Sequence, residues 1–317
     1  RTGHFYVYCS DYQTIFTGYG IKRSGKLLND IWALSTVDYS WHKLRLSGDS
    51  ISPRQGSSAV MMDNYIVVFG GADEKRHYSD LHTIDVTTGE VLIAETGGQI
   101  PPASKGCAIG LYRRKLFIFG GNDGEETFDG LYVLDFDTMN WTLVRCSVDI
   151  GEGFAFSSTR HHIYCCGAPK TKSLITIDMR KQNAITQELR EEPPHCEVQG
   201  AGMVRAGDYL FFFGGHSDEE FTKMYVGHIK TSRWFVFYMK PDGESTSYVD
   251  GKISKEGLFL LPDTSDFACS YVPERRQIFA FFGHPHKSPV PIFIVSIGDA
   301  LAILNDMEDM RNMLIFD

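Results

Sequence analysis

The chain has 317 residues, a net charge of −9 at neutral pH, 43% hydrophobic residues and 22% charged residues, an ordinary composition for a globular protein. It contains no dense run of lysine and arginine, which argues against a protein that binds the phosphate backbone of a nucleic acid. No apolar stretch approaches the roughly 18 residues of a membrane-spanning helix, so we expect no membrane insertion.

A strand–glycine pattern recurs six times along the chain. An apolar, strand-like stretch ends each time in a glycine pair or in a degenerate form of one. These pairs lie near residues 19–20, 70–71, 120–121, 167–168, 214–215 and 283–284. A sustained period of about 50 residues is typical of a repeat architecture, and it predicts one domain of six similar units.

The third unit shows what each repeat contains. Residues 106–111 and 115–121 form two apolar stretches separated by a short turn, and the second is rich in residues that favour strands. After a polar loop, residues 131–135 and 141–144 predict two further strands with a tight turn between them. Four short strands joined by turns indicate an antiparallel meander.

Large aromatic residues mark the third and fourth strands in alternate units. An aromatic residue of the third strand is followed nine residues later by a tryptophan in units one, three and five. These pairs are Trp32 and Trp41, Tyr132 and Trp141, and Tyr225 and Trp234. We expect the tryptophan rings to pack between neighbouring sheets, because a sheet that is apolar on both faces must be covered on both.

This alternation of glycine pair, tyrosine and tryptophan resembles the kelch repeat. The resemblance implies an all-β fold, a six-bladed β-propeller of four-stranded antiparallel blades, over residues 1–305. The first blade then starts with its own first strand, and the sixth blade needs a fourth strand near 301–305. Beyond it, the spacing of Leu304, Met307, Met310 and Leu314 predicts that the tail 306–317 is helical; we expect it to pack on the last blade or to lead into another module.

The seven cysteines predict a reduced protein. Their number is odd, no CxxC pair occurs, and several lie inside apolar strands. This pattern favours buried thiols and a cytoplasmic location.

The longer, more varied loops are expected on one face of the ring, between second and third strands and between blades. Binding residues concentrate on such loops. Charges of both signs alternate around this face, which suits a protein or peptide partner better than a polyanion. An insertion at 240–266 is a second candidate contact on the same face.

In kelch proteins that bind peptides, the contacts come from residues just before each first strand and just after each glycine pair. That resemblance implies the candidate partner-binding residues Arg54, Arg76, His77, Asn122, His216 and His284. Residues expected to line the central opening are Arg54, Gln55, Lys105, Glu152, Gln199 and Phe267.

Catalytic motifs are not found in the sequence. There is no GxSxG nucleophile motif. The side chains of His161 and His162 are expected to point apart, because adjacent residues of a strand lie on opposite faces, and His284-Pro285-His286 has no acidic or cysteine partner at a metal-binding spacing. We therefore predict a non-enzymatic adaptor or scaffold without cofactor or metal. The alternative is a carbohydrate-active or sugar-binding propeller whose pocket is the central opening.

Overall fold

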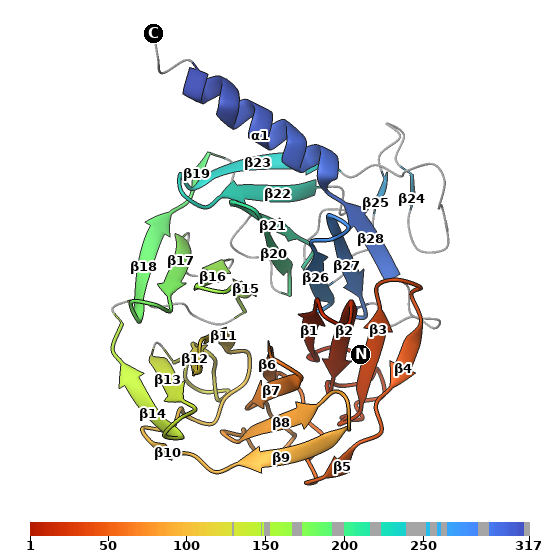
Figure 1. Cartoon of the computed structure of the whole chain (residues 1–317), viewed down its shortest axis with the longest axis vertical. Helices are drawn as coiled ribbons and strands as arrows, with labels where there is room; N and C mark the ends of the chain where they lie inside the picture. Colours follow the sequence, from red (N-terminus) through yellow and green to blue (C-terminus); the bar gives the residue numbers. More distant parts are fainter. Residues whose placement is uncertain are drawn as a thin grey trace.

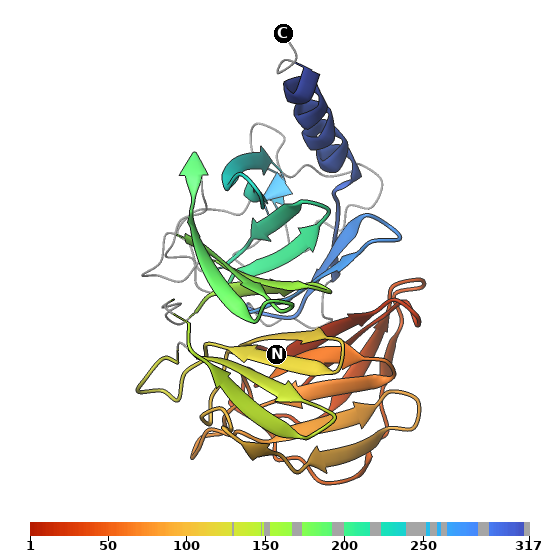
Figure 2. The ribbon, with the colours of Figure 1, turned by 60° about the vertical axis from the view of Figure 1, so that its left-hand side comes forward.

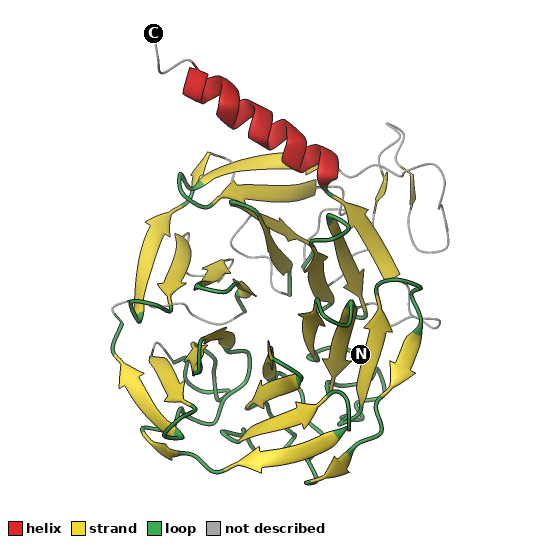
Figure 3. Cartoon of the chain, in the orientation of Figure 1, coloured by secondary structure: helices red, strands yellow, loops and turns green. Residues whose placement is uncertain are grey.

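The chain folds into a ring of six β-sheets, traced along the sequence in Figure 1 and by element type in Figure 3. The all-β, six-bladed propeller that the resemblance to kelch repeats implies is confirmed. The computed structural model describes residues 1–128, 130–146, 148, 153–166, 173–191, 200–215, 223–238, 252–253, 259–260, 265–284 and 292–313.

Each blade is a meander whose first strand lies nearest the centre of the ring. The first strands are β1 (Phe5–Cys9), β6 (Ser58–Met62), β11 (Ala108–Tyr112), β15 (Ala155–Ser158), β20 (Gly202–Ala206) and β26 (Ala268–Val272). The second strands are β2 (Thr14–Gly18), β7 (Tyr65–Phe69), β12 (Lys115–Phe119), β16 (His162–Cys166), β21 (Tyr209–Phe213) and β27 (Gln277–Phe281).

The outer half of each blade contains the third and fourth strands. The third strands are β3 (Ile31–Ser35), β8 (Leu81–Asp85), β13 (Leu131–Asp135), β17 (Ser173–Asp178), β22 (Lys223–His228) and β28 (Ile292–Ser296). The fourth strands are β4 (Trp41–Lys43), β9 (Glu90–Ala94), β14 (Asn140–Val144), β18 (Asn183–Glu188) and β23 (Arg233–Tyr238).

Three blades gain a fifth, two-residue strand that the sequence analysis did not predict. These strands are β5 (Ser47–Gly48), β10 (Gly97–Gly98) and β19 (Arg190–Glu191). Each follows the outer strand of one blade and pairs in parallel with the outer strand of the next, β9, β14 or β23. The chain thereby hydrogen-bonds adjacent blades at the periphery of the ring.

The glycine pairs after β7, β12 and β21 are needed because the chain turns sharply there. Gly70 and Gly71 have φ angles of 66° and 97°, a region that residues with a Cβ atom rarely adopt. A Cβ atom on Gly71 would also collide with Ser57 Oγ. The Phe-Gly-Gly sequence is thus repeated because the chain leaves the strand in a tight turn with positive φ angles.

Tryptophans of the fourth strands pack between blades, as predicted. The Trp141 ring lies 5.9 Å, centroid to centroid, from Phe69 in the preceding blade. Trp41 lies 5.3 Å from Phe281, which joins the first blade to the last. The ring also closes through the Gly283 amide, which donates to the Arg1 carbonyl at 2.9 Å.

The sixth blade differs from the prediction of a fourth strand near 301–305, which is wrong. Its sheet contains β26, β27 and β28, and the helix α1 (Gly298–Met313) begins just after them. The helix therefore starts before residue 306, where the helical tail was expected. Leu304 is buried, and its carbonyl accepts a hydrogen bond from the Tyr209 hydroxyl at 3.2 Å. Figure 2 shows α1 projecting beyond the ring.

The predicted insertion at 240–266 is described only at the short pair β24 (Lys252–Ile253) and β25 (Phe259–Leu260) and at 265–266. The rest of it lies outside the described residues. The predicted burial of cysteines is confirmed at Cys9, Cys107, Cys165, Cys166 and Cys269. Within the described ranges, no helix has the length and apolar content that a membrane span requires.

Candidate binding face

The two ends of the ring carry different connections. Short turns such as 63–64 and 113–114 join first to second strands on one end, which we call the turn face. Longer segments such as 19–30, 70–80 and 120–130 join second to third strands on the other end, which we call the loop face. The loop face is thus where the fold places its variable segments.

Backbone bridges hold the loop face together. A residue three positions before a first strand pairs with a residue at or just after the glycine pair of the same blade. These pairs are Thr2 and Ile21, Gln55 and Ala72, Lys105 and Asn122, and Ser265 and His284. The two sets of positions that the sequence analysis singled out therefore lie side by side in these four blades.

A second set of backbone bonds runs from blade to blade around the central opening. The Gly56 amide donates to the Gly3 carbonyl at 2.7 Å, and the Gly106 amide donates to the Gly56 carbonyl at 2.8 Å. The Asp266 amide donates in the same way to Gly200 at 2.8 Å. These bonds fix the positions from which the loops project, so the loop face is a preorganised surface.

Arg54 lies inside this framework. Its side chain is 2% exposed and forms an ion pair with Asp80. The guanidinium also donates to the carbonyls of Gly70 and Ser52, and its Cζ atom lies 3.7 Å from the ring centroid of Tyr78. Arg54 is thus a buried structural side chain that supports the surface.

The backbone of Arg54 extends this support to the neighbouring blade. Its carbonyl accepts from the Gly20 amide at 2.8 Å, and its amide donates to Leu28 at 3.1 Å. Arg54 therefore joins blade one, through its backbone, to blade two, through its side chain. The same arrangement recurs one repeat earlier, where Arg1 donates to Asp30 at 2.9 Å.

Arg76 is exposed above the same aromatic ring. Its Cζ atom lies 4.7 Å from the Tyr78 ring centroid, and cation–π contacts of this kind restrict a long side chain. Asp73 closes the loop beneath it, because its carboxylate accepts from the amides of Lys75 and Arg76 and from the Tyr78 hydroxyl. The loop thus presents an exposed arginine on an ordered base.

The Asp73 carboxyl provides a test of this loop. The Tyr78 hydroxyl, and then the Lys75 amide, hold the pKa of Asp73 at about 2, below its ordinary 3.8. Because the folded-state pKa is lowered, the stabilisation is present above the ordinary pKa and is lost as the pH falls through about 2. We expect Tyr78→Phe to raise the pKa of Asp73 toward 3.8, which a carboxyl-carbon NMR titration measures. An unchanged pKa would rule out the hydroxyl as its main cause.

His77 and Asn122 lie where blades two and three meet. A Cβ atom on Gly124 would lie 3.4 Å from His77 Cε1, so the two loops are in close proximity. Asn122 is half-buried, and its side-chain oxygen accepts from the Gly124 amide at 3.2 Å. Arg54, Arg76, His77 and Asn122 therefore belong to one continuous region of the loop face.

The remaining candidates lie elsewhere. His284 is exposed on blade six, which blade one separates from this region. Phe267 is buried, whereas Gln55 and Lys105 are half-buried. His216, Glu152 and Gln199 lie outside the described residues. The sequence analysis did not predict the contacts of Arg54 with Tyr78 and Asp80. Arginine and aspartate at equivalent positions of the first two repeats were a signal for the Arg54–Asp80 pair.

A central cavity of about 830 Å³ runs between the first strands. Its lining includes His4, Tyr6, Tyr8, Arg205 and Tyr271, and no carboxylate side chain is present among the described residues that line it. Glycosidases generally need a pair of carboxylic acids flanking the sugar bond. The described lining therefore contains no such pair, whereas Glu152 and Gln199, expected at the opening, lie outside the described residues. The carbohydrate-active or sugar-binding alternative stays a prediction.

Comparison with known proteins relates this architecture to a repeat family. The sequence model of the KLHDC2/KLHL20/DRC7 Kelch-repeats domain matches residues 3–172. The chain is 32% identical over 131 residues to acyl-CoA-binding domain-containing protein 4 of Arabidopsis thaliana. It is 27% identical over 201 residues to the Rab9 effector protein with kelch motifs of Bos taurus.

The alignments cover parts of both proteins. The Arabidopsis match covers 41% of this chain and 19% of that protein. The bovine match covers 57% of this chain and 54% of the bovine protein. The matches thus span about a fifth of the length of one relative and about half of the other.

Proposed function

Because this chain belongs to the kelch-repeat family, we propose that it is an interaction module whose loop face binds a segment of a partner protein. The observation that carries the proposal is an exposed Arg76 on a loop whose base is fixed by Asp73, Tyr78 and the buried Arg54. Preorganised loops lower the entropy lost on binding. A relative described by its name as a Rab9 effector with kelch motifs is in keeping with this role.

The charge distribution supports a polypeptide as the ligand. Beside Arg76, the exposed Glu125 and Glu126 belong to the loop of blade three. The Asp123 carboxylate orders that loop by accepting from their backbone amides at 3.0 and 2.8 Å. Charges of both signs on adjacent ordered loops give the electrostatic complementarity that selects a particular segment of a protein.

Affinity capture with variants tests the proposal. The bait is compared with the double variant Arg76→Ala and His284→Ala, which changes two exposed side chains of the loop face. We expect the variant to lose the partner that the wild-type protein captures from a native lysate. Interface arginines in packed contacts commonly contribute at least about 1–2 kcal/mol, so partner recovery should fall several-fold.

The matched control removes one arginine and one histidine elsewhere. Arg114 pairs with Asp137 on the turn face, and His42 lies on the outer strand β4; both are exposed. Arg114→Ala with His42→Ala should leave capture unchanged. Equal capture by all three proteins would reject Arg76 and His284 as contacts, and loss only in the control would move the site away from the loop face.

A further inference from the structure

On the turn face of blades three to five, several basic side chains have no acidic partner among the described residues. Four aspartates occur on these turns or at the strand ends beside them, and each already has a basic partner. The pairs are Arg114–Asp137, Lys115–Asp135, Arg180–Asp178 and Lys230–Asp208. Among the described residues, Arg113, Arg160 and Arg205 have no ion-pair partner, on a protein whose net charge is −9.

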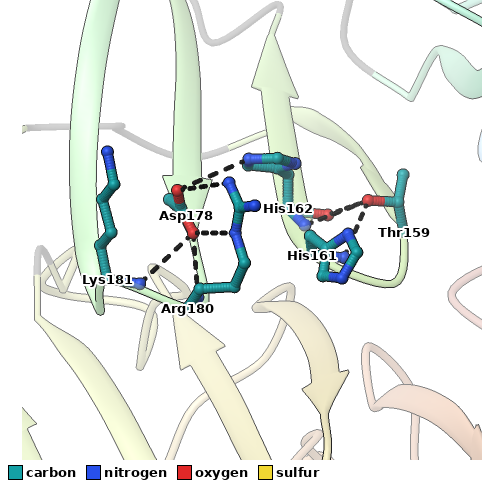
Figure 4. Close-up of polar contacts among 6 residues, drawn as sticks. All are labelled: Thr159, His161, His162, Asp178, Arg180 and Lys181. Carbon is teal, nitrogen blue, oxygen red and sulfur yellow. Dashed lines mark hydrogen bonds and ion pairs between the residues drawn. The ribbon is translucent and has the colours of Figure 1, made fainter.

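Asp178 illustrates why these aspartates cannot neutralise the remaining cations (Figure 4). Its carboxylate accepts from the Arg180 guanidinium at 3.0 and 3.1 Å and from the Lys181 amide at 3.3 Å. His162 Nε2 lies 3.7 Å from the same carboxylate. The Arg180 side chain is the main cause of a pKa of about 2 for Asp178. The described partners of this carboxylate therefore all belong to blade four, and it does not neutralise the remaining cations.

Arg205 reaches the same area from blade five. Its amide donates to Ser157 Oγ of β15 at 3.1 Å, which places the inner strands of the two blades side by side. The Arg205 Nε atom is buried and has no hydrogen-bond partner among the described residues. A buried guanidinium nitrogen without an acceptor is unfavourable, and an anion bound beside it would remove that penalty.

The central cavity provides the space for such an anion. Arg160 and Arg205 both line it, together with Tyr8, Tyr271 and the Ser157 hydroxyl. Arg160 belongs to the β15–β16 turn, so this part of the cavity opens on the turn face. The lining offers two cations and the hydroxyls of Ser157 and Tyr271. The Tyr8 hydroxyl donates to the Glu274 carboxylate of blade six at 2.8 Å, so an anion would bind on the side of the cavity formed by blades four and five.

Arg113 extends the positive region to blade three. Its Cζ atom lies 5.3 Å from the ring centroid of Tyr112. The Tyr112 ring in turn lies 5.5 Å from that of His161, the residue after Arg160. The three uncompensated arginines therefore occupy neighbouring first strands and turns.

We propose that this region binds a compact oligophosphate anion at the turn-face mouth of the central cavity. The planar guanidinium matches phosphate oxygens through paired hydrogen bonds. Three arginines suit an anion with several charges, whereas a long nucleic acid would need a more extended basic surface. The site lies opposite the loop face, so it is independent of the protein-binding function proposed above.

Titration calorimetry with tripolyphosphate at low ionic strength tests the proposal. We expect one binding site per chain in the wild-type protein. Arg205→Gln and the double variant Arg113→Gln with Arg160→Gln should each raise the Kd at least about tenfold, because each removes charged hydrogen bonds to the anion. Arg113 and Arg160 are exposed, so the double variant remains informative if Arg205→Gln fails to fold.

The matched control removes two exposed cations from the loop face, Arg23→Gln with Lys26→Gln, and should keep the wild-type Kd. Citrate provides a polyanion without phosphate and should bind at least about tenfold more weakly. Absence of tripolyphosphate binding, equal binding by the double variant, an equal loss in the control or equally tight binding of citrate would each overturn the proposal.

Discussion

Replacing Arg54 by alanine is expected to lower the free energy of unfolding by about 3 kcal/mol, because removing one partner of a buried ion pair leaves the other poorly compensated. The side chain is 2% exposed, and its guanidinium contacts Asp80, Gly70 and Tyr78 together. The Asp80 side chain is 27% exposed, so water recovers part of the loss. Urea unfolding of the variant and the wild-type protein measures the difference.

Arg76→Ala is the control for this prediction, since Arg76 lies over the same Tyr78 ring but is exposed. It should cost much less stability than Arg54→Ala, because water already surrounds the exposed guanidinium. Equal losses of unfolding free energy in the two variants would show that burial and the Asp80 ion pair add nothing to stability. That result would contradict the structural role of Arg54.

Replacing Trp141 by alanine is expected to cost about 3–5 kcal/mol, the usual range for a large aromatic residue removed from a core. The Trp141 side chain is 2% exposed and packs against Phe69 of the preceding blade. Its indole nitrogen also donates to Thr96 Oγ1 at 3.1 Å. The substitution would open a cavity between two blades and leave Thr96 without this partner.

Leu92→Ala provides the comparison for Trp141. Leu92 lies on the fourth strand β9 of the adjacent blade and is 50% exposed, so its truncation should change stability by less than about 1 kcal/mol. Thermal unfolding of both variants tests the prediction. A loss at Trp141 no larger than that at Leu92 would contradict the assignment of the tryptophan to the interface between blades.

The repeat could be predicted because one local requirement recurs. The chain takes positive φ angles directly after β7, β12 and β21, at Gly70 and Gly71, Gly120 and Gly121, and Gly214 and Gly215. Glycine adopts such angles at little cost, whereas Tyr19 and Phe282 adopt them in blades one and six, where the glycine pair is degenerate. The tryptophans could be predicted for a similar reason, since a ring between two blades requires a large apolar side chain.

The last blade could not be predicted by the same template. The repeat required a strand near 301–305, but Ala300, Leu301, Ala302 and Leu304 favour a helix, and Asp299 lies in the first turn, where a negative charge stabilises a helix. These residues follow their own preference for a helix, because the ring closes without a fourth strand at 301–305. Trp41 packs on Phe281, and the Gly283 amide bonds to Arg1.

The sequence predicted where the candidate residues lie on the ring, but not which side chains they contact. The sequence placed Arg54 at the start of a first strand on the loop face, where it lies. Its burial depends on Tyr78 and Asp80, which are more than twenty residues away in the chain, and a single sequence does not show that contact. Arg205 was missed for the same reason, because its surroundings come from two blades.

The most direct test of the account is the dissociation constant of the captured partner segment, measured by calorimetry. The loop-face variant with Arg76→Ala and His284→Ala and the control with Arg114→Ala and His42→Ala are compared with the wild-type protein. We expect the loop-face variant to bind at least about tenfold more weakly, since the loss of about 1.4 kcal/mol changes Kd tenfold, and the control to bind equally well. Equal affinity of all three proteins would contradict a partner site at these loop-face residues.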